Sequence, residues 1–367
     1  MTIRFSTAAM ARPASLPSSL LLNGNHRLLG WLMAAGLALA TTPALAGDSL
    51  TGNVVTADEQ GASLTRLNLA NGEATTRSIG ITPHNVQVSD AGRYLMAVGE
   101  PASDDHAHGG GGHAHGDAPG KLKLYPADEP IGAPLASIDV GSHPAHVVSD
   151  LESRFAFVTN AGDNSVSVVD LEARESVTTI ATGESPHGLR LSPDGSELYV
   201  ANVLDGSVSV IDVAAREEVA RLPVGQAPVQ VGFTPDGANV FVSLRDENRV
   251  AVIDTASREV IEHIEVGRLP IQVHATADGR FMLVANEGSE AEPDNRVSVI
   301  ALDSLAVVAT YEVGAGAHGI SVDDSGRFAF ITGLYDDSLS VIDLDAGAVI
   351  SRHDTGQGPN GVTWVGH

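Results

Sequence analysis

The side chains of this chain that are best suited to chemistry are histidines, and several lie within one glycine-rich stretch. The segment Asp104-Asp105-His106-Ala107-His108-Gly109-Gly110-Gly111-Gly112-His113-Ala114-His115-Gly116-Asp117 contains two His-x-His pairs joined by four glycines. Short histidine-rich tracts are typical of metal-binding segments. We therefore predict a flexible loop with the metal ligands His106, His108, His113 and His115. Ordering such a loop costs conformational entropy, so we expect moderate affinity. The alternative is a polar loop whose histidines bind nothing.

A second group of histidines follows a turn that recurs along the chain with the pattern Gly-x-x-(Pro/Ala). His84, His187 and His318 come directly after this pattern, and His146 comes one residue later. Neutral imidazoles bind zinc, copper or nickel without any thiolate. These four residues are candidate metal ligands if the fold brings the turns together. The competing interpretation is that each imidazole hydrogen-bonds to a carbonyl of a neighbouring turn.

Composition excludes several other classes of function. The chain has no cysteine, which rules out disulfides, thiolate nucleophiles, iron-sulfur clusters and cysteine-type zinc sites. Acidic residues outnumber Lys and Arg by 46 to 21, so nucleic acid and anionic membranes are poor partners. The sequence also shows no Gly-x-Ser-x-Gly elbow, phosphate-binding glycine loop or haem-attachment motif, and we predict no catalytic residue.

The recurring turn defines a repeat that must position these histidines. Its glycines are Gly80, Gly141, Gly183, Gly225, Gly267, Gly314 and Gly356, with spacings of 61, 42, 42, 42, 47 and 42 residues. One unit shows four alternating apolar segments, at 145–149, 154–159, 165–170 and 175–181, which are typical of strands. Four strands in about 42 residues, without helical periodicity, indicate a β-propeller blade.

Blade counting predicts a closed ring. The first unit, residues 52–80, offers three strands, at 53–57, 63–69 and 73–79, and residues 359–365 form a strand with no partner after it. If this C-terminal strand joins the N-terminal blade, no sheet edge stays open. The sequence therefore predicts an all-β, seven-bladed β-propeller with four antiparallel strands per blade over residues 47–367. The histidine-rich segment is then an insertion at 99–119.

Several strands resemble a known family of repeats. Leu198-Tyr199-Val200-Ala201-Asn202, Phe155-Ala156-Phe157-Val158-Thr159-Asn160 and the Ser-Val-Ser-Val-Ile-Asp strand at 207–212 are similar to YVTN-type β-propellers. The resemblance covers about residues 50–367 and implies the fold. It says little about function, because the family includes periplasmic and surface-layer proteins, propellers of haem d1 and methylamine dehydrogenases, and lactonase-like enzymes.

The propeller topology predicts where the histidines meet. In such propellers the first strand of a blade is innermost, so His84, His146, His187 and His318 should line one side of one channel mouth, opposite Val229 and Ile271. The turn between second and third strands lies on the same face. The histidine-rich insertion should therefore hang over this mouth, and the acidic insertion 287–295 should face it across the ring, unless it is an ordinary solvated loop.

The N-terminus predicts export. Arg27 precedes an apolar run at 28–40, and Pro43-Ala44-Leu45-Ala46 ends in the small-x-small pattern of a signal-peptide cleavage site. The run is shorter than the about 20 residues that span a bilayer. We expect residues 1–46 to be a signal peptide and the mature protein to be periplasmic or secreted, monomeric and free of the membrane.

These observations combine into one leading hypothesis and two alternatives. The chain is similar in architecture to propeller-type periplasmic zinc metallochaperones. We therefore predict an exported propeller that binds zinc, with copper or nickel as other candidates, and stores it or passes it to a periplasmic metal-binding protein of an importer. One alternative is a metal-free YVTN-type interaction scaffold. The other is a lactonase-like hydrolase, which would need a carboxylate that the repeats do not place.

Overall fold

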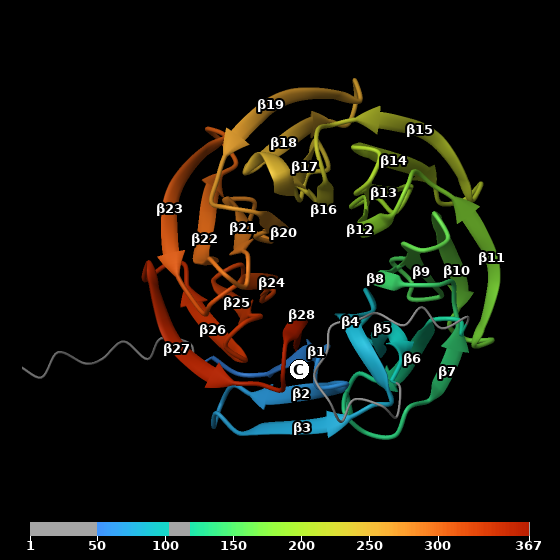
Figure 1. The fold of residues 1–367 in the computed structure, drawn as a ribbon, viewed down its shortest axis with the longest axis horizontal. Coiled ribbons are helices and arrows are strands. Elements are labelled where there is room, and N and C mark those ends of the chain that lie inside the picture. The colour runs from blue at the N-terminus through green and yellow to red at the C-terminus, as the bar shows by residue number, and fades with distance from the viewer. Residues whose placement is uncertain (1–49, 103–117, 367) are drawn as a thin grey trace, which may run out of the picture. The chain divides into compact units, whose positions relative to one another are not determined.

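Seven four-stranded sheets stand around a central axis in a ring, as Figure 1 shows. The structure is a computed structural model that describes residues 50–102 and 118–366. The predicted signal peptide and the ligands His106, His108, His113 and His115 lie outside the described residues. Among the described residues, no helix is long and apolar enough to cross a membrane.

Each blade contains four consecutive strands, except the first, which takes its innermost strand from the C-terminal end. From the inside outward, blade 1 comprises β28 (Pro359–Val365), β1 (Asn53–Asp58), β2 (Ser63–Asn68) and β3 (Ala74–Ser78). Blade 2 comprises β4 (Ile81–Val88), β5 (Tyr94–Pro101), β6 (Lys121–Pro126) and β7 (Ala136–Asp139). Blade 3 comprises β8 (Pro144–Ser149), β9 (Phe155–Asn160), β10 (Ser165–Asp170) and β11 (Glu175–Ala181).

The remaining blades repeat this order. Blade 4 comprises β12 (Pro186–Leu191), β13 (Glu197–Asn202), β14 (Ser207–Asp212) and β15 (Glu217–Pro223). Blade 5 comprises β16 (Pro228–Phe233), β17 (Asn239–Leu244), β18 (Arg249–Asp254) and β19 (Glu259–Glu265), with a 3-10 turn, η1, at Arg245–Glu247. Blade 6 comprises β20 (Pro270–Ala275), β21 (Phe281–Gly288), β22 (Pro293–Ala301) and β23 (Ala306–Glu312), and blade 7 comprises β24 (Ala317–Val322), β25 (Phe328–Gly333), β26 (Ser338–Asp343) and β27 (Ala348–Asp354).

Ring closure follows the predicted pairing of the two ends. Strand β28 pairs with β1 in antiparallel register, with Asn53 opposite Val365 and Thr56 opposite Val362 (Figure 1). The predicted seven-bladed, all-β fold with four antiparallel strands per blade is therefore confirmed. Because β28 hydrogen-bonds to the inner edge of β1, this edge of blade 1 is not left unpaired.

The core lies between neighbouring blades. Val98 and Leu122 of blade 2 pack in one cluster with Val147 and Val158 of blade 3. Because inner strands are covered by a blade on each side, they are buried on both faces, as in β8, where all six residues are buried. Outer strands face solvent on one side, and β11 is exposed at six of its seven residues.

The marker glycine of the repeat is explained by its contact with the second strand of the same blade. A Cβ on Gly141 would lie 2.5 Å from Cγ of Asn160, and one on Gly267 would lie 2.4 Å from Cγ of Asn286. Asn160 in turn donates from Nδ2 to the hydroxyls of Ser165 and Ser167, at 3.0 and 2.9 Å. Glycine, asparagine and serine thus belong to one buried contact that recurs in several blades.

The smaller insertion, expected as a loop at 287–295, mostly lengthens a hairpin instead. Strand β21 continues to Gly288, which pairs with Pro293 of β22. Arg268 donates from Nη1 to Glu292 Oε2 at 3.1 Å, and its backbone N–H donates to Asp294 Oδ2 at 3.0 Å. These contacts hold the hairpin against the turn that enters blade 6.

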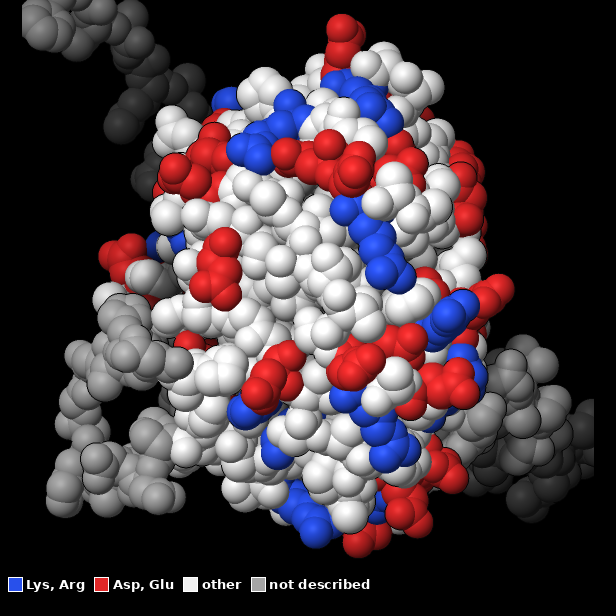
Figure 2. Space-filling view, turned by 90° about the vertical axis from the view of Figure 1, so that its right-hand side faces the viewer, with Lys and Arg blue, Asp and Glu red and all other residues white. Residues whose placement is uncertain are grey.

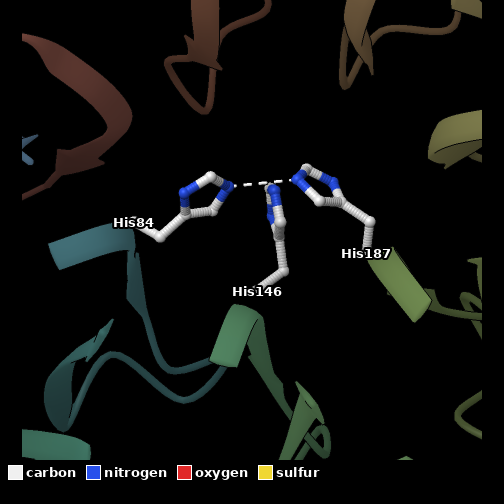
Figure 3. Close-up of side chains that lie close together, drawn as sticks. All are labelled: His84, His146 and His187. Carbon is white, nitrogen blue, oxygen red and sulfur yellow. Dashed lines mark hydrogen bonds between the residues drawn. The ribbon is translucent and has the colours of Figure 1, made fainter. Parts of the chain in front are cut away.

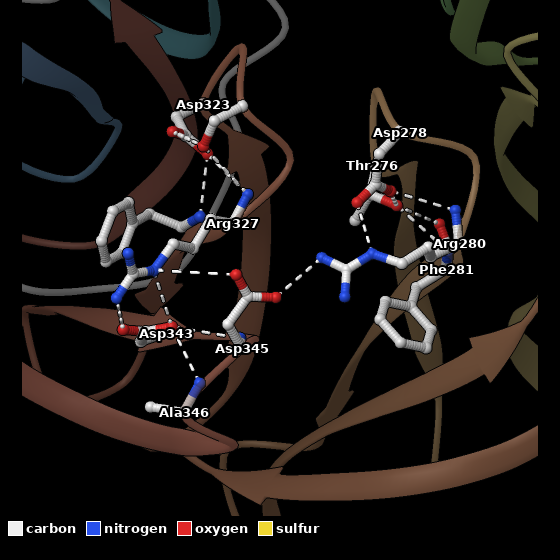
Figure 4. A network of polar contacts seen from close by, with 11 residues as sticks. Thr276, Asp278, Arg280, Phe281, Asp323, Arg327, Asp343, Asp345 and Ala346 are labelled. Atoms are coloured by element: carbon white, nitrogen blue, oxygen red, sulfur yellow. Dashed lines mark hydrogen bonds and ion pairs between the residues drawn. The ribbon is translucent and has the colours of Figure 1, made fainter. Parts of the chain in front are cut away.

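Charged side chains also connect blades at the surface. Arg280 of blade 6 donates to Asp345 of blade 7 at 2.9 Å, and Arg327 lies within 4.0 Å of the same carboxylate (Figure 4). On the side shown in Figure 2, acidic and basic residues lie interspersed, without a large area that is only basic. This face therefore offers no extended cationic surface for a polyanion.

Candidate metal centre at the channel mouth

Three of the predicted ligands converge at the start of three adjacent inner strands. His84 lies in β4, His146 in β8 and His187 in β12, and their rings point toward one another (Figure 3). The Nε2 atoms of His84 and His187 are 3.1 Å apart. One ligand nitrogen from each of the three residues lies within 4.8 Å of the others. The recurring turn thus places imidazoles from neighbouring blades at a single point.

Hydrogen bonds at the far side of two rings fix which nitrogen faces the centre. His187 Nδ1 lies 3.2 Å from the carbonyl oxygen of Val229, which can only accept, so Nδ1 carries the proton. His84 Nδ1 lies 3.3 Å from Glu59 Oε1 and donates to that carboxylate. Each neutral ring then presents the lone pair of Nε2 to the centre. A histidine held in this way by a carboxylate or a carbonyl has the orientation of a metal ligand.

Two lone pairs facing each other at 3.1 Å require a cation between them. Burial works to lower the pKa of His84, but the carboxylates of Glu59 and Glu287 raise it above its ordinary value. Burial and the charge on His84 lower the pKa of His187 to about 3. Without metal, a proton shared by the two nitrogens is therefore favoured on His84 over His187.

Glu59 supplies the negative charge of this centre. Burial opposes its ionisation, but the charge and hydrogen bond of His84 lower the pKa of Glu59 to about 2. Asn360 of β28 donates to its other carboxylate oxygen. Glu59 is therefore ionised and held in place at neutral pH.

His146 lies deeper than the other two histidines and is 1% exposed. Burial, followed by the charges of His187 and His84, lowers its pKa well below the ordinary value. The side-chain nitrogens of Gln230 and Gln272 lie 3.5 and 3.4 Å from its two ring nitrogens. His146 is therefore a neutral imidazole on a polar floor, which is the form that binds metal.

The set of ligands fits a transition metal. A tetrahedral zinc ion with Zn–N bonds of about 2.0–2.1 Å needs nitrogens about 3.4 Å apart. The Nε2 atoms of His84 and His187 already have nearly this separation. The ligand nitrogen of His146 lies within 4.8 Å of them and has to move closer to bind the same ion. Three histidines leave a fourth position open for another ligand.

The fourth predicted ligand, His318 of β24, has different partners. Its Nδ1 donates to the carbonyl of Asn360 at 2.9 Å, and its Nε2 lies 3.7 Å from Glu287 Oε2. Tyr335 donates its hydroxyl to the other oxygen of Glu287. His318 thus belongs to a separate group with Glu287 and Tyr335, and the structure does not bring it into the three-histidine cluster.

Both interpretations of the turn histidines apply at once. His187 and His318 each contact a carbonyl of the next blade, at Val229 and Asn360, as the purely structural alternative predicted. Because the carbonyl engages Nδ1, it leaves Nε2 for a ligand. The contact orients the imidazole and does not exclude metal binding.

Sequence reasoning missed Glu59 as a partner of this site and treated Glu287 as part of a loop. Glu59 directly follows β1, the second strand of blade 1, and Glu287 and Glu100 occupy the aligned position near the ends of β21 and β5. Ala161 and Val203 stand there in blades 3 and 4. Three acids at an aligned position next to the mouth were a signal available in the repeat.

Two further histidines lie near the channel or its turns. His143 Nε2 lies 3.4 Å from Glu100 Oε1 at the surface. His274 of β20 directs Nδ1 to the carbonyl of Ala275 at 2.9 Å, and burial with the charge of Arg190 lowers its pKa to about 4. Neither residue joins the three-histidine cluster.

The fold and the site define a seven-bladed propeller with a histidine cluster at one channel mouth. Residues 127–276 match the family described as "YNCE-like beta-propeller", which confirms the predicted resemblance to YVTN-type repeats. No match was found among curated proteins.

Three solved structures illustrate the similarity of fold. A functionally unknown protein from Desulfotomaculum acetoxidans is 14% identical with a TM-score of 0.71, covering 86% of this chain and 99% of its own. The periplasmic gluconolactonase PpgL of Pseudomonas aeruginosa is 21% identical with a TM-score of 0.68 and the same coverage, 86% and 99%. Hydrazine synthase of Kuenenia stuttgartiensis is 22% identical with a TM-score of 0.65, covering 77% of this chain and 89% of its own. At these identities the similarity concerns the fold alone.

Proposed function

We propose that this protein is an exported propeller that binds a transition metal, zinc in the first place, and stores it or transfers it to a partner. The observation that carries the proposal is the convergence of His84, His146 and His187, with two Nε2 atoms 3.1 Å apart. The histidine-rich segment 104–117 would capture metal and exchange it with this site. The partner would be a periplasmic metal-binding protein of an importer.

The chemistry of the ligands supports zinc, with copper and nickel as alternatives. All three ligands are imidazoles, and two of them have their proton-bearing nitrogen engaged by Glu59 or by Val229. Nitrogen ligands with an open fourth position suit zinc, and they also suit copper and nickel. An open position is what exchange with a second set of histidines requires.

Metal titration tests the proposal directly. The purified protein is titrated with zinc, copper and nickel, and the titration is repeated with H84A/H187A and with residues 104–117 deleted. We expect the double variant to lose the tight site and the deletion to lose the weaker sites. H263A, on the exposed outer strand β19, is the matched control and should bind as the unaltered protein does. If the intact protein binds none of the metals more tightly than about 10 μM, metal binding is refuted and the metal-free scaffold is favoured.

A second candidate, a lactonase-like hydrolase, is favoured by the carboxylates at the mouth. Glu287 lies against His318 and receives the hydroxyl of Tyr335, so a carboxylate stands beside the cluster where the hydrolase hypothesis needs one. PpgL, a gluconolactonase by its title, shares the fold. Hydrolysis of small lactones by the zinc-loaded protein, abolished in E287Q while zinc binding is retained, would establish this function. Metal transfer to a partner without lactone hydrolysis would exclude it.

A further inference from the structure

The far end of the inner strands holds a cationic side chain, Arg190, that the three-histidine cluster does not use. Strand β12 begins at the cluster with His187 and reaches Arg190 three residues later, about 10 Å along the strand. Arg190 lies at the boundary of two adjoining hollows of about 350 and 400 Å³. The first is also lined by Gly232 and His274, and the second by Gln87 and Asp90. Volumes of this size suit a small ligand.

The guanidinium of Arg190 has no acidic partner among the described residues. Among the described residues, Arg190 makes one hydrogen bond, from Nη1 to the carbonyl oxygen of Leu189 at 2.9 Å, and no ion pair. Burial lowers the pKa of Arg190 to about 10, whereas a paired carboxylate would raise it. A guanidinium has five N–H donors, so most of its donors stay available.

The aspartates around the two hollows do not form an ion pair with Arg190. Asp323 Oδ1 accepts the backbone N–H groups of Arg327 and Phe328, at 3.0 and 2.8 Å, and so caps its own turn (Figure 4). Burial and the nearby carboxylate of Asp150 raise the pKa of Asp90, the opposite of what an ion pair with Arg190 would do. Asp324 lines the first hollow at its turn and forms no ion pair among the described residues.

Arg190 is only partly exposed, so its uncompensated charge is poorly hydrated, and a counter-ion reduces that cost. The planar fork of arginine matches two oxygens of a carboxylate with two parallel hydrogen bonds. Asp324 and Asp90 beside the hollows disfavour a multiply charged anion such as phosphate. We propose that this end of the channel binds a small monocarboxylate through the guanidinium of Arg190, at a site separate from the metal cluster.

Acetate is the probe for this site, with inorganic phosphate as the comparison at equal ionic strength. In a low-salt buffer we expect acetate to give a saturable heat of binding with a Kd of about 1 mM, and to raise the melting temperature of the purified protein. R190Q should weaken acetate binding at least about tenfold. R190K keeps the charge but loses the planar fork of the guanidinium. Its affinity for acetate should lie between those of the unaltered protein and R190Q.

Arg249 on β18, paired with Glu265 at 3.5 Å, supplies the matched control. R249Q should leave the acetate effect unchanged. If R190Q does not fold, R190K carries the test, because it keeps a cation at the same place. An acetate response equal in the unaltered protein and R190K would overturn recognition by the fork. No saturable acetate response, or saturable binding of phosphate alone, would overturn the monocarboxylate site.

Discussion

Replacing Asp58 by asparagine should stabilise the protein at neutral pH and change little in acid. Asp58 ends β1, is 0% exposed and accepts hydrogen bonds from Thr56 and Thr65, both at 2.7 Å, and from Ser63 at 3.1 Å. Blades 3, 4 and 6 have asparagine at this place, namely Asn160, Asn202 and Asn286. Asp58 thus places a carboxylate at a buried position where three other blades have a neutral amide.

The magnitude follows from linkage between protonation and folding. Burial, opposed in part by the three hydroxyls, raises the pKa of Asp58 from 3.8 to about 6. The folded state therefore holds the proton more tightly than the unfolded state, so stability is lost as the pH rises from about 4 to about 6. A shift of this size corresponds to about 3 kcal/mol at pH 7, because one pKa unit is worth 1.36 kcal/mol.

Urea unfolding of the unaltered protein and D58N from pH 4 to pH 8 measures the difference. We expect the free energies of unfolding to agree near pH 4 and D58N to be more stable by up to about 3 kcal/mol above pH 7. The reciprocal change N202D is the control, because Asn202 has the aligned position in blade 4 and donates from Nδ2 to the hydroxyls of Ser207 and Ser209, both at 2.9 Å. N202D should acquire the pH dependence that D58N loses. A difference between D58N and the unaltered protein that does not vary with pH would refute the reasoning.

Three further predictions concern the site, the repeat and the surface. E59Q should weaken zinc binding about 10–100-fold by competition with a chromophoric chelator, because Glu59 orients His84; an unchanged affinity would contradict its role. G141A should cost more free energy of unfolding than G80A. A Cβ at Gly141 meets Asn160 at 2.5 Å, whereas one at Gly80 meets nothing within 4 Å and adds only the backbone strain of its φ of 71°. Equal costs would contradict the packing explanation. D345N should lower stability by less than about 1 kcal/mol, since Asp345 is half exposed, and a larger loss in thermal unfolding would show that its contact with Arg280 is more than a surface pair.

The fold was predictable because the repeat shows the same pattern many times. The 42-residue spacing and the incomplete first unit together predicted the pairing of β28 with β1, which the structure confirms. Strand bounds agree closely, as in the predicted 165–170 and 175–181 and the observed β10 and β11. Local strand propensity and the 42-residue repeat period predict the same strands, so few alternative strand registers remain.

The sequence predicted roughly where the histidines lie, but not which atoms they contact. Alignment of the turns placed His84, His146, His187 and His318 near one mouth, but spacing does not say which nitrogen points where. The direction of His318 depends on the carbonyl of Asn360 and on Glu287, which lie in other blades. Glu59 was missed because it belongs to the incomplete first unit. This unit can be aligned with the other blades only after the C-terminal strand is recognised as its missing first strand.

The geometry of the three-histidine cluster depends on a complete ring. Glu59 follows β1, Asn360 lies in β28, and the hydrogen bond between them spans 301 residues of chain. The carboxylate that orients His84 is thus itself fastened by the strand that closes the ring. A chain that has not yet formed β28 carries His84, His146 and His187 without this support. If the three-histidine cluster binds metal as proposed, its full ligand geometry forms only with the last strand, and finished molecules would accept metal in preference to partly folded ones.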